Sequence, residues 1–366
     1  MVVLGTRPEI IKLAPILFEL EKATNRFQTD LVWSGQHIEL AKPFLKLFGL
    51  KPRHSFEIMI PNQTSGDICS LTMGKLSGLV KKSKPDLLMV QGDTTTAFTA
   101  ALCAFYHGVP VAHVEAGLRS GHPDQPFPEE KNRKLISHLS TFNFAPTLLA
   151  KQNLLKEKID PKSVFVVGNS VIDAIQWLLK HHPKPKTTNF APFDPKKEKL
   201  LLVTAHRRES FGTPLENICK ALVILARRHS NLKIVFPVHS NPKVQEIVLP
   251  ILKNHKQIHL MPPLDYVSFI HLLTQSFAIL SDSGGVQEEA PALGKPALIL
   301  RDVTERPEGI AMGVNRLVGR ETGRIITGVE ALLNDPVEYK KRARVCFPFG
   351  RGNAAEKIVR ILKEKY

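Results

Sequence analysis

Residues 85–117, PDLLMVQGDTTTAFTAALCAFYHGVPVAHVEAG, contain the pattern that decides the fold. A short apolar run ends in a glycine-containing turn, a stretch of helical length follows, and a second apolar run leads to Glu115. This order predicts a strand, a turn, a helix and a second strand. Strands that alternate with helices of this length are typical of parallel, doubly wound sheets. We therefore expect an α/β fold.

The same alternation continues on both sides of this segment. MVVLG at residues 1–5 predicts a strand followed by a helix that opens at Pro8, and the alternation restarts with KLLLVTAH at 199–206. Two such runs predict two Rossmann-like domains, which we place at 1–170 and 171–352. Residues 181–199 are rich in proline and lack apolar periodicity, which indicates an exposed linker. Alternatively, the hinge between the two domains lies slightly before this linker, near 167–170.

The composition excludes several classes of protein. The chain has 366 residues, of which 43% are hydrophobic and 23% are charged, so it is neither collagen-like nor wholly disordered. No run approaches the ~20 apolar residues that a membrane helix needs, and the N-terminus lacks the pattern of a signal peptide. The four cysteines are far apart and lack metal-ligand spacing, which predicts buried free thiols and no zinc site. We expect a cytoplasmic protein.

The formal net charge of +16 suggests nucleic acid, a membrane surface or an anionic small molecule as a partner. The excess is spread along the chain, its densest runs do not interleave aromatic residues, and aromatic residues make up only 7% of the chain. A nucleic-acid-binding protein would need a charged stripe with stacking aromatic side chains. We therefore favour a lysine-rich surface, with an acidic ligand held by a few placed arginines, and expect neither nucleic acid nor membrane as a partner.

Charged side chains of the first half follow expected strands, at the sheet edge where open α/β proteins bind ligands. Arg7 follows the first strand, and Lys12 lies one helical turn further on. Asp93 and Glu115 follow two later strands, and Glu129 opens a helix behind three prolines. Each residue also has an ordinary interpretation, as a surface cation, a helix N-cap or an acidic first turn. Neighbouring strands would nevertheless bring Asp93 and Glu115 into one crevice.

The second half has the features of an anion site. His206 and Arg207 follow its first strand, which combines positive charge with a titratable group. The Ser-Gly-Gly turn at 283–285 lets the backbone approach a ligand closely, and the helix that follows favours phosphate at its N-terminus. Glu289 lies about one turn into this helix, and Arg306 follows a later strand. Carboxylates on one half and a phosphate-binding turn on the other suggest a nucleotide-sugar enzyme whose active site lies in the cleft between the domains.

Eight segments together resemble the non-hydrolysing UDP-N-acetylglucosamine 2-epimerases of bacteria, and the match runs from Gly5 to about Gly319 and more loosely to the end. The segments are GTRPEIIKLAP, QGDTTTA, HVEAGLRS, FPEEKNR, TAHRRESFG, PVHSNP, SDSGGVQEEAPALGKP and TERPEG. The resemblance implies two Rossmann-like domains of the GT-B type, with a C-terminal helix at 353–366 that packs back on the first domain. It also implies a homodimer that interconverts UDP-GlcNAc and UDP-ManNAc for surface polysaccharide, without a metal or a nicotinamide cofactor.

The resemblance also implies roles for individual residues. The positions that match the family's catalytic set are Asp93, Glu115, Glu129 and His206. The positions that match its substrate contacts are Arg7, Lys12, Phe269, Ser283, Gly284, Gly285, Glu289 and Arg306. The positions that match an allosteric site for UDP-GlcNAc are Gln36, His37, Arg207 and His239. The sequence departs from the family pattern at Leu264, at 38–40 and at Arg351.

The implied reaction eliminates UDP to give 2-acetamidoglucal and then returns a proton to the other face of C2. It needs charge stabilisation at the departing diphosphate and acid/base groups near C2, and the sequence leaves open which group moves which proton. The alternatives are a 2-epimerase of a related UDP-2-acetamido sugar, a hydrolysing epimerase that releases ManNAc and UDP, and a GT-B glycosyltransferase. The HVEAGLRS form argues against the hydrolysing branch, and the acid cluster argues against the glycosyltransferase.

Overall fold

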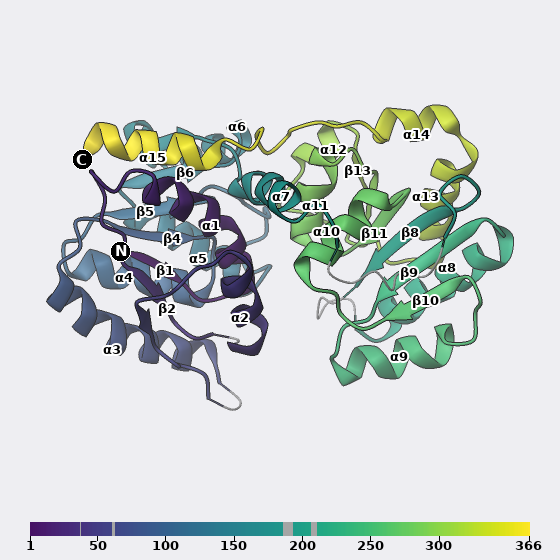
Figure 1. Ribbon diagram of the computed structural model, residues 1–366, viewed down its shortest axis with the longest axis horizontal. Coiled ribbons are helices and arrows are strands. Elements are labelled where there is room, and N and C mark those ends of the chain that lie inside the picture. The colour runs from purple at the N-terminus through teal and green to yellow at the C-terminus, as the bar shows by residue number, and fades with distance from the viewer. Residues whose placement is uncertain (37, 61–62, 186–192, 206–210) are drawn as a thin grey trace. The chain divides into compact units, whose positions relative to one another are not determined.

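The structure, a computed structural model, describes residues 1–36, 38–60, 63–185, 193–205 and 211–366. The chain divides into two compact units (Figure 1). The first unit contains Met1–Gln176 and Phe349–Tyr366, and the second contains Trp177–Pro348. The division falls inside helix α7 (Ser170–His181), whereas the sequence pattern places it at 170.

A parallel sheet forms the centre of the first unit. Within the described residues it has seven strands in the order β3-β2-β1-β4-β5-β6-β7. The strands are β1 (Val2–Leu4), β2 (Leu31–Trp33), β3 (His54–Ser55), β4 (Leu88–Gln91), β5 (Val111–Val114), β6 (Phe142–Ala145) and β7 (Val164–Val166). Every residue of β4 is buried, as expected for a parallel strand that is covered on both faces. The strand order reverses between β1 and β4, which makes this the switch point of the sheet.

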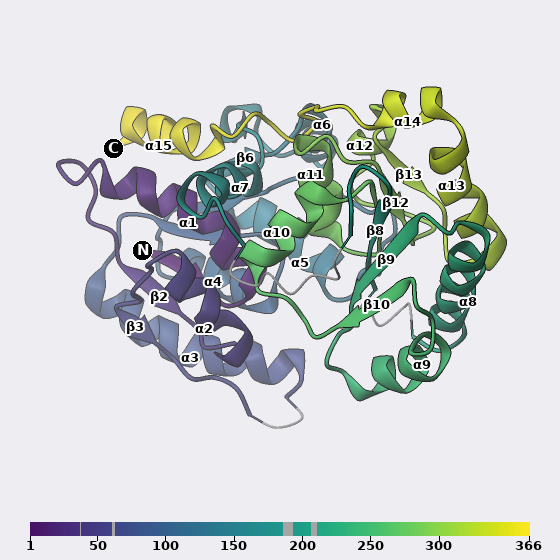
Figure 2. The ribbon, with the colours of Figure 1, turned by 45° about the vertical axis from the view of Figure 1, so that its right-hand side comes forward.

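Helices cover both faces of this sheet. They are α1 (Arg7–Glu21), α2 (Ile38–Leu47), α3 (Ser65–Ser83), α4 (Thr95–Tyr106), α5 (Glu129–Leu139), α6 (Leu148–Lys156), the 3-10 helix η1 (Pro161–Ser163), the start of α7, and α15 (Ala354–Lys365). Helix α4 packs between α3 and α5, and their apolar side chains form one core with Val3, Leu88 and Val90 of the sheet. Helix α1 packs with α2 and α15 (Figure 2).

The second unit repeats this plan with a sheet of six parallel strands within the described residues, in the order β10-β9-β8-β11-β12-β13. The strands are β8 (Lys199–Thr204), β9 (Leu232–Pro237), β10 (Ile258–Met261), β11 (Ala278–Ser281), β12 (Ala297–Ile299) and β13 (Asn315–Leu317). The helices are α8 (Thr213–Arg228), α9 (Pro242–Leu252), α10 (Tyr266–Gln275), α11 (Gly284–Ala292), α12 (Glu308–Ala311), α13 (Thr322–Asn334) and α14 (Pro336–Arg342). Two doubly wound parallel sheets confirm the expected fold class.

The C-terminal segment belongs to the first unit, where α15 lies along α1 (Figure 1). Asp173 of α7 accepts hydrogen bonds from the backbone N–H groups of Ala354 and Ala355, at 3.3 and 3.0 Å. The segment that enters α15 passes very close to the chain before α7: a Cβ on Gly350 would lie only 2.8 Å from the Cα atom of Gly168. Helix α15 is therefore docked by hydrogen bonds at its N-terminus as well as by apolar packing.

Two details differ from the sequence expectations. Strand β5 begins at Val111, although the apolar run begins at residue 109, because Pro110 has no N–H group to donate to the sheet. All four cysteines are free, but Cys69 is only half-buried, whereas Cys103, Cys219 and Cys346 are buried as expected. Among the described residues, none of the helices combines the length and the apolar character that crossing a membrane requires.

Candidate active site

Three predicted residues lie at the carboxyl edge of the first sheet. Arg7 is the first residue of α1, which follows β1; Asp93 lies in the loop after β4; and Glu115 directly follows β5, the neighbour of β4. Open α/β sheets bind ligands outside the carboxyl ends of their strands. The fold therefore brings these three side chains to one edge of one sheet.

Arg7 is exposed in the first turn of α1. Its guanidinium lies 5.7 Å from the centroid of the Phe44 ring, a distance at which a cation is attracted to the face of an aromatic ring. The helix N-terminus adds its positive dipole end at the same place. This corner of the first unit is suited to an anionic group.

Lys12 and Glu115 form a buried ion pair, with side chains that are 8% and 7% exposed. Asn169 donates a hydrogen bond from Nδ2 to the same Glu115 oxygen at 3.0 Å, and Ser170 Oγ donates to the Lys12 carbonyl at 2.6 Å. Glu115 also has a backbone φ of 68°, in the left-handed region that residues other than glycine seldom adopt. Strained backbone of this kind clusters at functional sites. The sequence motifs predict Lys12 and Glu115 separately and do not reveal that they are paired.

Helix α5 holds Asp93 in place. Arg133 forms an ion pair with the Asp93 carboxylate, and Asn132 Nδ2 donates to the Asp93 carbonyl at 3.0 Å. Glu129, the first residue of α5, is half-buried. The sequence motif singles out Glu129 alone, although Asn132 and Arg133 follow it at the i+3 and i+4 spacing that places residues on one helical face. That spacing is the signal by which Asn132 and Arg133 could have been found.

The remainder of the HVEAGLRS motif fixes the loop after Glu115. Gly117 has a φ of 90°, and a Cβ at this position would lie 2.3 Å from the carbonyl oxygen of Ala150, so only glycine fits. Arg119 forms a bidentate ion pair with Glu157 at the end of α6, at 2.8 and 2.6 Å. Gly117 and Arg119 therefore hold the loop that follows Glu115.

His113 is a buried residue that the motifs did not single out as functional. Its Nε2 donates a hydrogen bond at 2.7 Å to the carbonyl oxygen of Gly92, the residue before Asp93. Burial lowers the pKa of His113 to about 4, so the imidazole is neutral at pH 7. His113 thus supports the backbone of the loop that carries Asp93.

Glu9 is a second residue that sequence reasoning missed. It is only 1% exposed, and its carboxylate accepts a hydrogen bond from the backbone N–H of Thr6 at 2.6 Å. Burial raises the pKa of Glu9 to about 7, against the opposing effect of hydrogen bonds from Thr6, Thr94 and Gly5. The T-x-x-E spacing of Thr6 and Glu9, a capping-box pattern, is the signal that could have found it.

The second sheet has its switch point between β8 and β11. The hydroxyls of Thr204 and Ser281, at the ends of these strands, share a hydrogen bond of 2.6 Å, and the N–H of Ser283 donates to Ser281 Oγ at 3.0 Å. Helix α11 begins at Gly284. A Cβ on Gly285 would meet nothing closer than 3.8 Å, so packing within the protein does not require glycine there. The turn leaves room for a ligand at a helix N-terminus.

Two further predicted contacts lie beside this turn. Tyr266 donates its hydroxyl hydrogen bond to Glu289 Oε1 at 2.9 Å, and Glu289 is buried. Phe269 of α10 is partly buried against an apolar core that includes Leu272 and Val286. Both side chains are therefore held by the second unit itself.

Arg306 occupies the centre of a buried ion-pair network. Its Nε lies 2.5 Å from an oxygen of Glu288, and its Nη1 pairs with Glu305. Arg301 pairs with the other oxygen of Glu305 at 3.0 Å. The structure thus shows a network role for Arg306, and its contact with substrate stays a prediction.

Three of the predicted residues, His206, His37 and Arg207, lie outside the described residues. Of the expected allosteric set, Gln36 belongs to the first unit, where its Oε1 accepts a hydrogen bond from Thr96 at 3.0 Å. His239 is exposed in the second unit, and its Nδ1 accepts from the N–H of Asn241 at 3.1 Å. An allosteric site formed by these residues stays a prediction.

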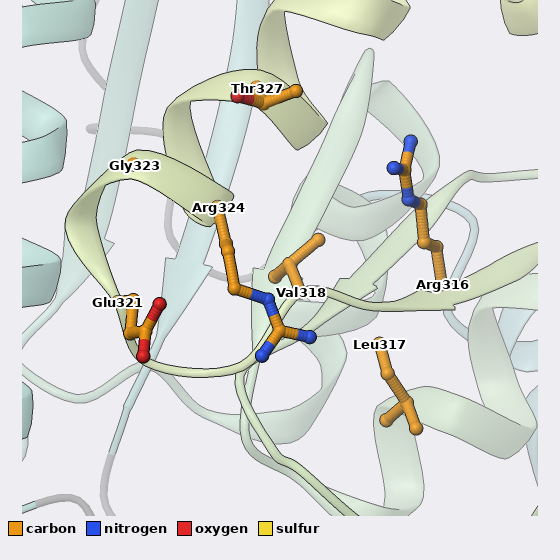
Figure 3. A pocket seen from close by; sticks show the side chains of 7 residues that line it. All are labelled: Arg316, Leu317, Val318, Glu321, Gly323, Arg324 and Thr327. Atoms are coloured by element: carbon orange, nitrogen blue, oxygen red, sulfur yellow. The ribbon is translucent and has the colours of Figure 1, made fainter.

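A pocket of about 410 Å³ lies in the second unit between β13 and the start of α13 (Figure 3). Arg316, Glu321 and Arg324 supply its charged side chains. Its lining comes from residues 316–327 and includes none of the predicted site residues. Across the described ranges, His, Cys, Asp and Glu form no group of three that could hold a metal ion.

Comparisons with known proteins assign the chain to a family. The sequence profile described as UDP-N-acetylglucosamine 2-epimerase matches residues 19–363. The chain belongs to the UDP-N-acetylglucosamine 2-epimerase family. A relative of that name from Yersinia pestis is 43% identical over 99% of this chain and 98% of its own length. Membership of the epimerase family confirms the resemblance found in the motifs.

Solved structures of epimerases share the fold. The UDP-GlcNAc 2-epimerase from Neisseria meningitidis, bound to UDP-GlcNAc, superposes with a TM-score of 0.94 at 42% identity, covering 99% of both chains. The epimerase from Methanocaldococcus jannaschii, in complex with UDP-GlcNAc and UDP, has a TM-score of 0.86 at 37% identity and also covers 99% of both chains. The GT-B architecture that the resemblance implies is confirmed by these epimerase structures.

Proposed function

We propose that this protein interconverts UDP-N-acetylglucosamine and UDP-N-acetylmannosamine by inverting C2 of the sugar. The observation that carries the proposal is the pair of carboxylates, Asp93 and Glu115, which follow neighbouring strands at the carboxyl edge of the first sheet in a chain of the UDP-N-acetylglucosamine 2-epimerase family. The open glycine turn at the start of α11 supports a diphosphate site in the second unit. Relatives that bear the epimerase name over nearly the full length support the same reaction.

The chemistry follows from the substrate. C2 of the sugar is not next to a carbonyl group, so its proton is not acidic. The C1–O bond to UDP therefore breaks first, and its electron pair leaves with the diphosphate oxygen. The positive character that develops at C1 acidifies the C2–H bond. A base then takes the C2 proton, and the released electron pair forms the C1=C2 double bond of 2-acetamidoglucal.

The return steps invert the stereochemistry. A proton is added to the opposite face of C2, and the diphosphate oxygen forms the bond to C1 again. UDP and the glucal stay bound throughout, so atoms and electrons balance without water or a redox partner. This retention of both fragments distinguishes the proposed non-hydrolysing reaction from hydrolysis.

We assign the acid/base work to Asp93, Glu115, Glu129 and His206. The ion pairs with Arg133 and Lys12 support this assignment, because they fix the carboxylates of Asp93 and Glu115 in position. Pre-organised groups need no rearrangement during proton transfer.

We assign the departing UDP to residues that favour negative charge. The backbone N–H groups of the turn at 283–285 would bind the diphosphate, and its growing charge would be stabilised further by Arg7 and Arg306. The ribose would contact Glu289, the uracil would pack near Phe269, and Lys12 would contact the substrate beside Glu115. Regulation by a second UDP-GlcNAc at Gln36, His37, Arg207 and His239, and a homodimer, are further parts of the proposal. Light scattering of the purified chain tests the dimer.

Proton NMR of the full-length protein with UDP-GlcNAc in D2O tests the reaction. We expect UDP-ManNAc to appear with solvent deuterium at C2 in both epimers. Free ManNAc with UDP would mean hydrolysis. No reaction with UDP-GlcNAc, but C2 exchange in a related UDP-2-acetamido sugar, would reassign the substrate. No exchange in any of these sugars would overturn the proposed epimerisation.

A further inference from the structure

Glu9 contacts both loops that meet at the switch point of the first unit. In the loop after β1, its Oε2 accepts hydrogen bonds from Thr6 N at 2.6 Å, Thr6 Oγ1 at 2.7 Å and Gly5 N at 3.3 Å. In the loop after β4, its Oε1 accepts a hydrogen bond from Thr94 Oγ1 at 3.1 Å. One buried carboxylate therefore joins the loop that precedes Arg7 to the loop that carries Asp93.

The sheet by itself does not fix the separation of these loops. Strands β1 and β4 are neighbours, with Val2 opposite Met89, but the chain then continues from them into different layers. Helix α1 packs with α2 and α15, whereas α4 packs with α3 and α5. Helix α1 also contacts β4, helix α4 also contacts β1, and Gly5 lies against the Thr96 side chain, so the two loops already pack on each other. Glu9 adds directed hydrogen bonds to this packing, because its carboxylate bonds to both loops.

Thr94 transmits the contact to Asp93 and to α4. Its hydroxyl donates to Glu9 and accepts a hydrogen bond from the N–H of Ala97 at 3.0 Å, which caps α4. Thr94 is also the next residue after Asp93, whose carboxylate is held on its other side by Arg133. A displacement of the Glu9 carboxylate would therefore move the backbone beside Asp93.

We propose that Glu9 is a positioning residue that keeps Arg7 and Asp93 at the separation that the UDP-sugar requires. This inference rests on the function proposed above, in which Arg7 meets the anionic part of the substrate and Asp93 the reacting sugar. A misplacement of about 1 Å in such groups lowers turnover about 100-fold. The alternative is that Glu9 only caps the N-terminus of α1 through Thr6 and Gly5.

A double-mutant cycle between Glu9 and Thr94 separates these roles. Thr94→Val removes the bridging hydroxyl at nearly constant volume, and Thr94→Ser is the matched control that keeps it. We expect Glu9→Ala and Thr94→Val each to lower kcat by about 10- to 100-fold, with Thr94→Ser near wild type. The double variant should lose about as much kcat as the more impaired single variant, because both changes break the same Glu9–Thr94 hydrogen bond.

Two results in turnover would overturn the inference. Multiplied losses in the double variant would show that Glu9 and Thr94 act independently. Equal and wild-type kcat for the folded Thr94→Val and Thr94→Ser variants would show that the bridge is irrelevant to turnover. If Glu9→Ala does not fold, the comparison of kcat between Thr94→Val and Thr94→Ser still tests the bridge.

Hydrogen exchange of the full chain without ligand tests the bridge independently of activity. In Glu9→Ala, or in Thr94→Val compared with Thr94→Ser, we expect the backbone N–H groups at 92–97 to exchange about fivefold faster, as loss of a hydrogen bond of ordinary strength predicts. In Glu9→Ala the backbone N–H groups at 5–10 should also exchange faster. Unchanged exchange at 92–97 in these comparisons would overturn the bridge. If the wild-type protein does not epimerise UDP-GlcNAc, the proposed function is overturned. The hydrogen-exchange result would still show whether Glu9 and Thr94 form the bridge between the two loops.

Discussion

Glu115 is held by three kinds of constraint: a buried ion pair with Lys12, a hydrogen bond from Asn169 and a left-handed backbone conformation. Asp93 is held by a different set, the side chains of Asn132 and Arg133 on α5. Two carboxylates that are fixed independently can keep a constant relation to a substrate. At the scale of single residues, contacts within the protein therefore fix both carboxylates in position.

The first prediction concerns the carboxylates. Asp93→Asn, Glu115→Gln and Glu129→Gln should each lower kcat by about 100-fold or more, because loss of a general acid or base typically costs this much. UDP alone should bind to each variant with nearly wild-type Kd, since the proposed UDP contacts of α11 are untouched. Steady-state kinetics and calorimetry measure both quantities. Near-normal kcat in two of the three variants would remove the proposed acid/base set.

The second prediction concerns His113 and pH. The unfolded chain takes up a proton at a pKa near 6.5, whereas burial lowers the pKa of the folded His113 to about 4. The unfolded state thus binds more protons between these values, so the stability from His113 is complete above pH 6.5 and is lost as pH falls toward 4. The loss approaches about 3 kcal/mol at most.

His113→Gln keeps a side-chain donor for the Gly92 carbonyl but cannot titrate. We therefore expect the free energy of unfolding to fall less in this variant than in the wild type as the pH is lowered from about 7.5 to about 5, because the variant lacks the titrating imidazole. Urea unfolding of both proteins at each pH provides the comparison. Parallel losses in the two proteins would show that His113 is not the titrating group.

Helix termini do much of the positioning at the scale of elements. Helix α5 holds Asp93, the first turn of α1 presents Arg7, and the start of α11 provides an open glycine turn. Each of these elements begins at the carboxyl edge of a parallel sheet, so its exposed N–H groups face the ligand side. Within each unit, candidate residues therefore lie where a strand leads into a helix, at Arg7 after β1 and at Gly285 after β11.

The third prediction concerns the glycine turn. Gly285→Ala should fold normally, because its Cβ would meet no protein atom closer than 3.8 Å, yet it should weaken UDP binding about tenfold or more if phosphate oxygens occupy that space. Gly66→Ala is a matched control, since Gly66 is the second residue of α3 as Gly285 is of α11. Calorimetry with UDP compares them. Wild-type affinity in a folded Gly285→Ala variant would place the diphosphate elsewhere.

The fourth prediction concerns the docking of α15. Asp173→Ala should lower the free energy of unfolding by about 1–3 kcal/mol, because it leaves the N–H groups of Ala354 and Ala355 without their carboxylate partner. Hydrogen exchange should rise mainly in α15. An exposed carboxylate, Asp160, caps only the short 3-10 helix η1, so Asp160→Ala serves as the control. Equal losses of stability in the two variants would contradict a special role for Asp173.

Charge is the property that acts at the scale of the whole molecule. The formal net charge of +16 is spread over the chain and attracts anionic ligands at long range. This attraction is screened as the Debye length falls from about 10 Å at 0.1 M salt to about 3 Å at 1 M. The Kd of a nucleoside diphosphate should therefore depend on salt concentration more strongly than the Kd of its uncharged nucleoside.

The fifth prediction follows from this difference. The Kd for UDP should rise several-fold between about 0.05 and 0.5 M KCl, because screening weakens the attraction. The Kd for uridine, which carries no phosphate, should change little. Calorimetry at each salt concentration measures both. An equal salt response of the two ligands would show that the net charge does not contribute to UDP binding.

Much of the fold and part of the site could be predicted from local sequence. Alternating apolar runs and amphipathic stretches predict parallel strands and helices, because burial on both faces of a sheet imposes that pattern. Gly92 directly follows β4, and the polar residues Asp93 and Glu115 beside strand ends are the pattern that predicts them as candidates. The sequence by itself thus determined the two doubly wound sheets and the placement of Asp93 and Glu115 at the carboxyl ends of their strands.

The tertiary structure alone decided which of these residues act together. Lys12 pairs with Glu115, Arg133 with Asp93, and Glu9 with Thr94, and the members of each pair are far apart in the sequence. Such pairs depend on the order of the strands and on the direction in which each helix leaves the sheet, and neither is encoded in a local pattern. Helix α7 shows the same limit, since its apolar pattern runs unbroken across the boundary between the units. The local sequence determines which segments form strands and helices, whereas the packing of the folded chain determines which side chains pair with one another.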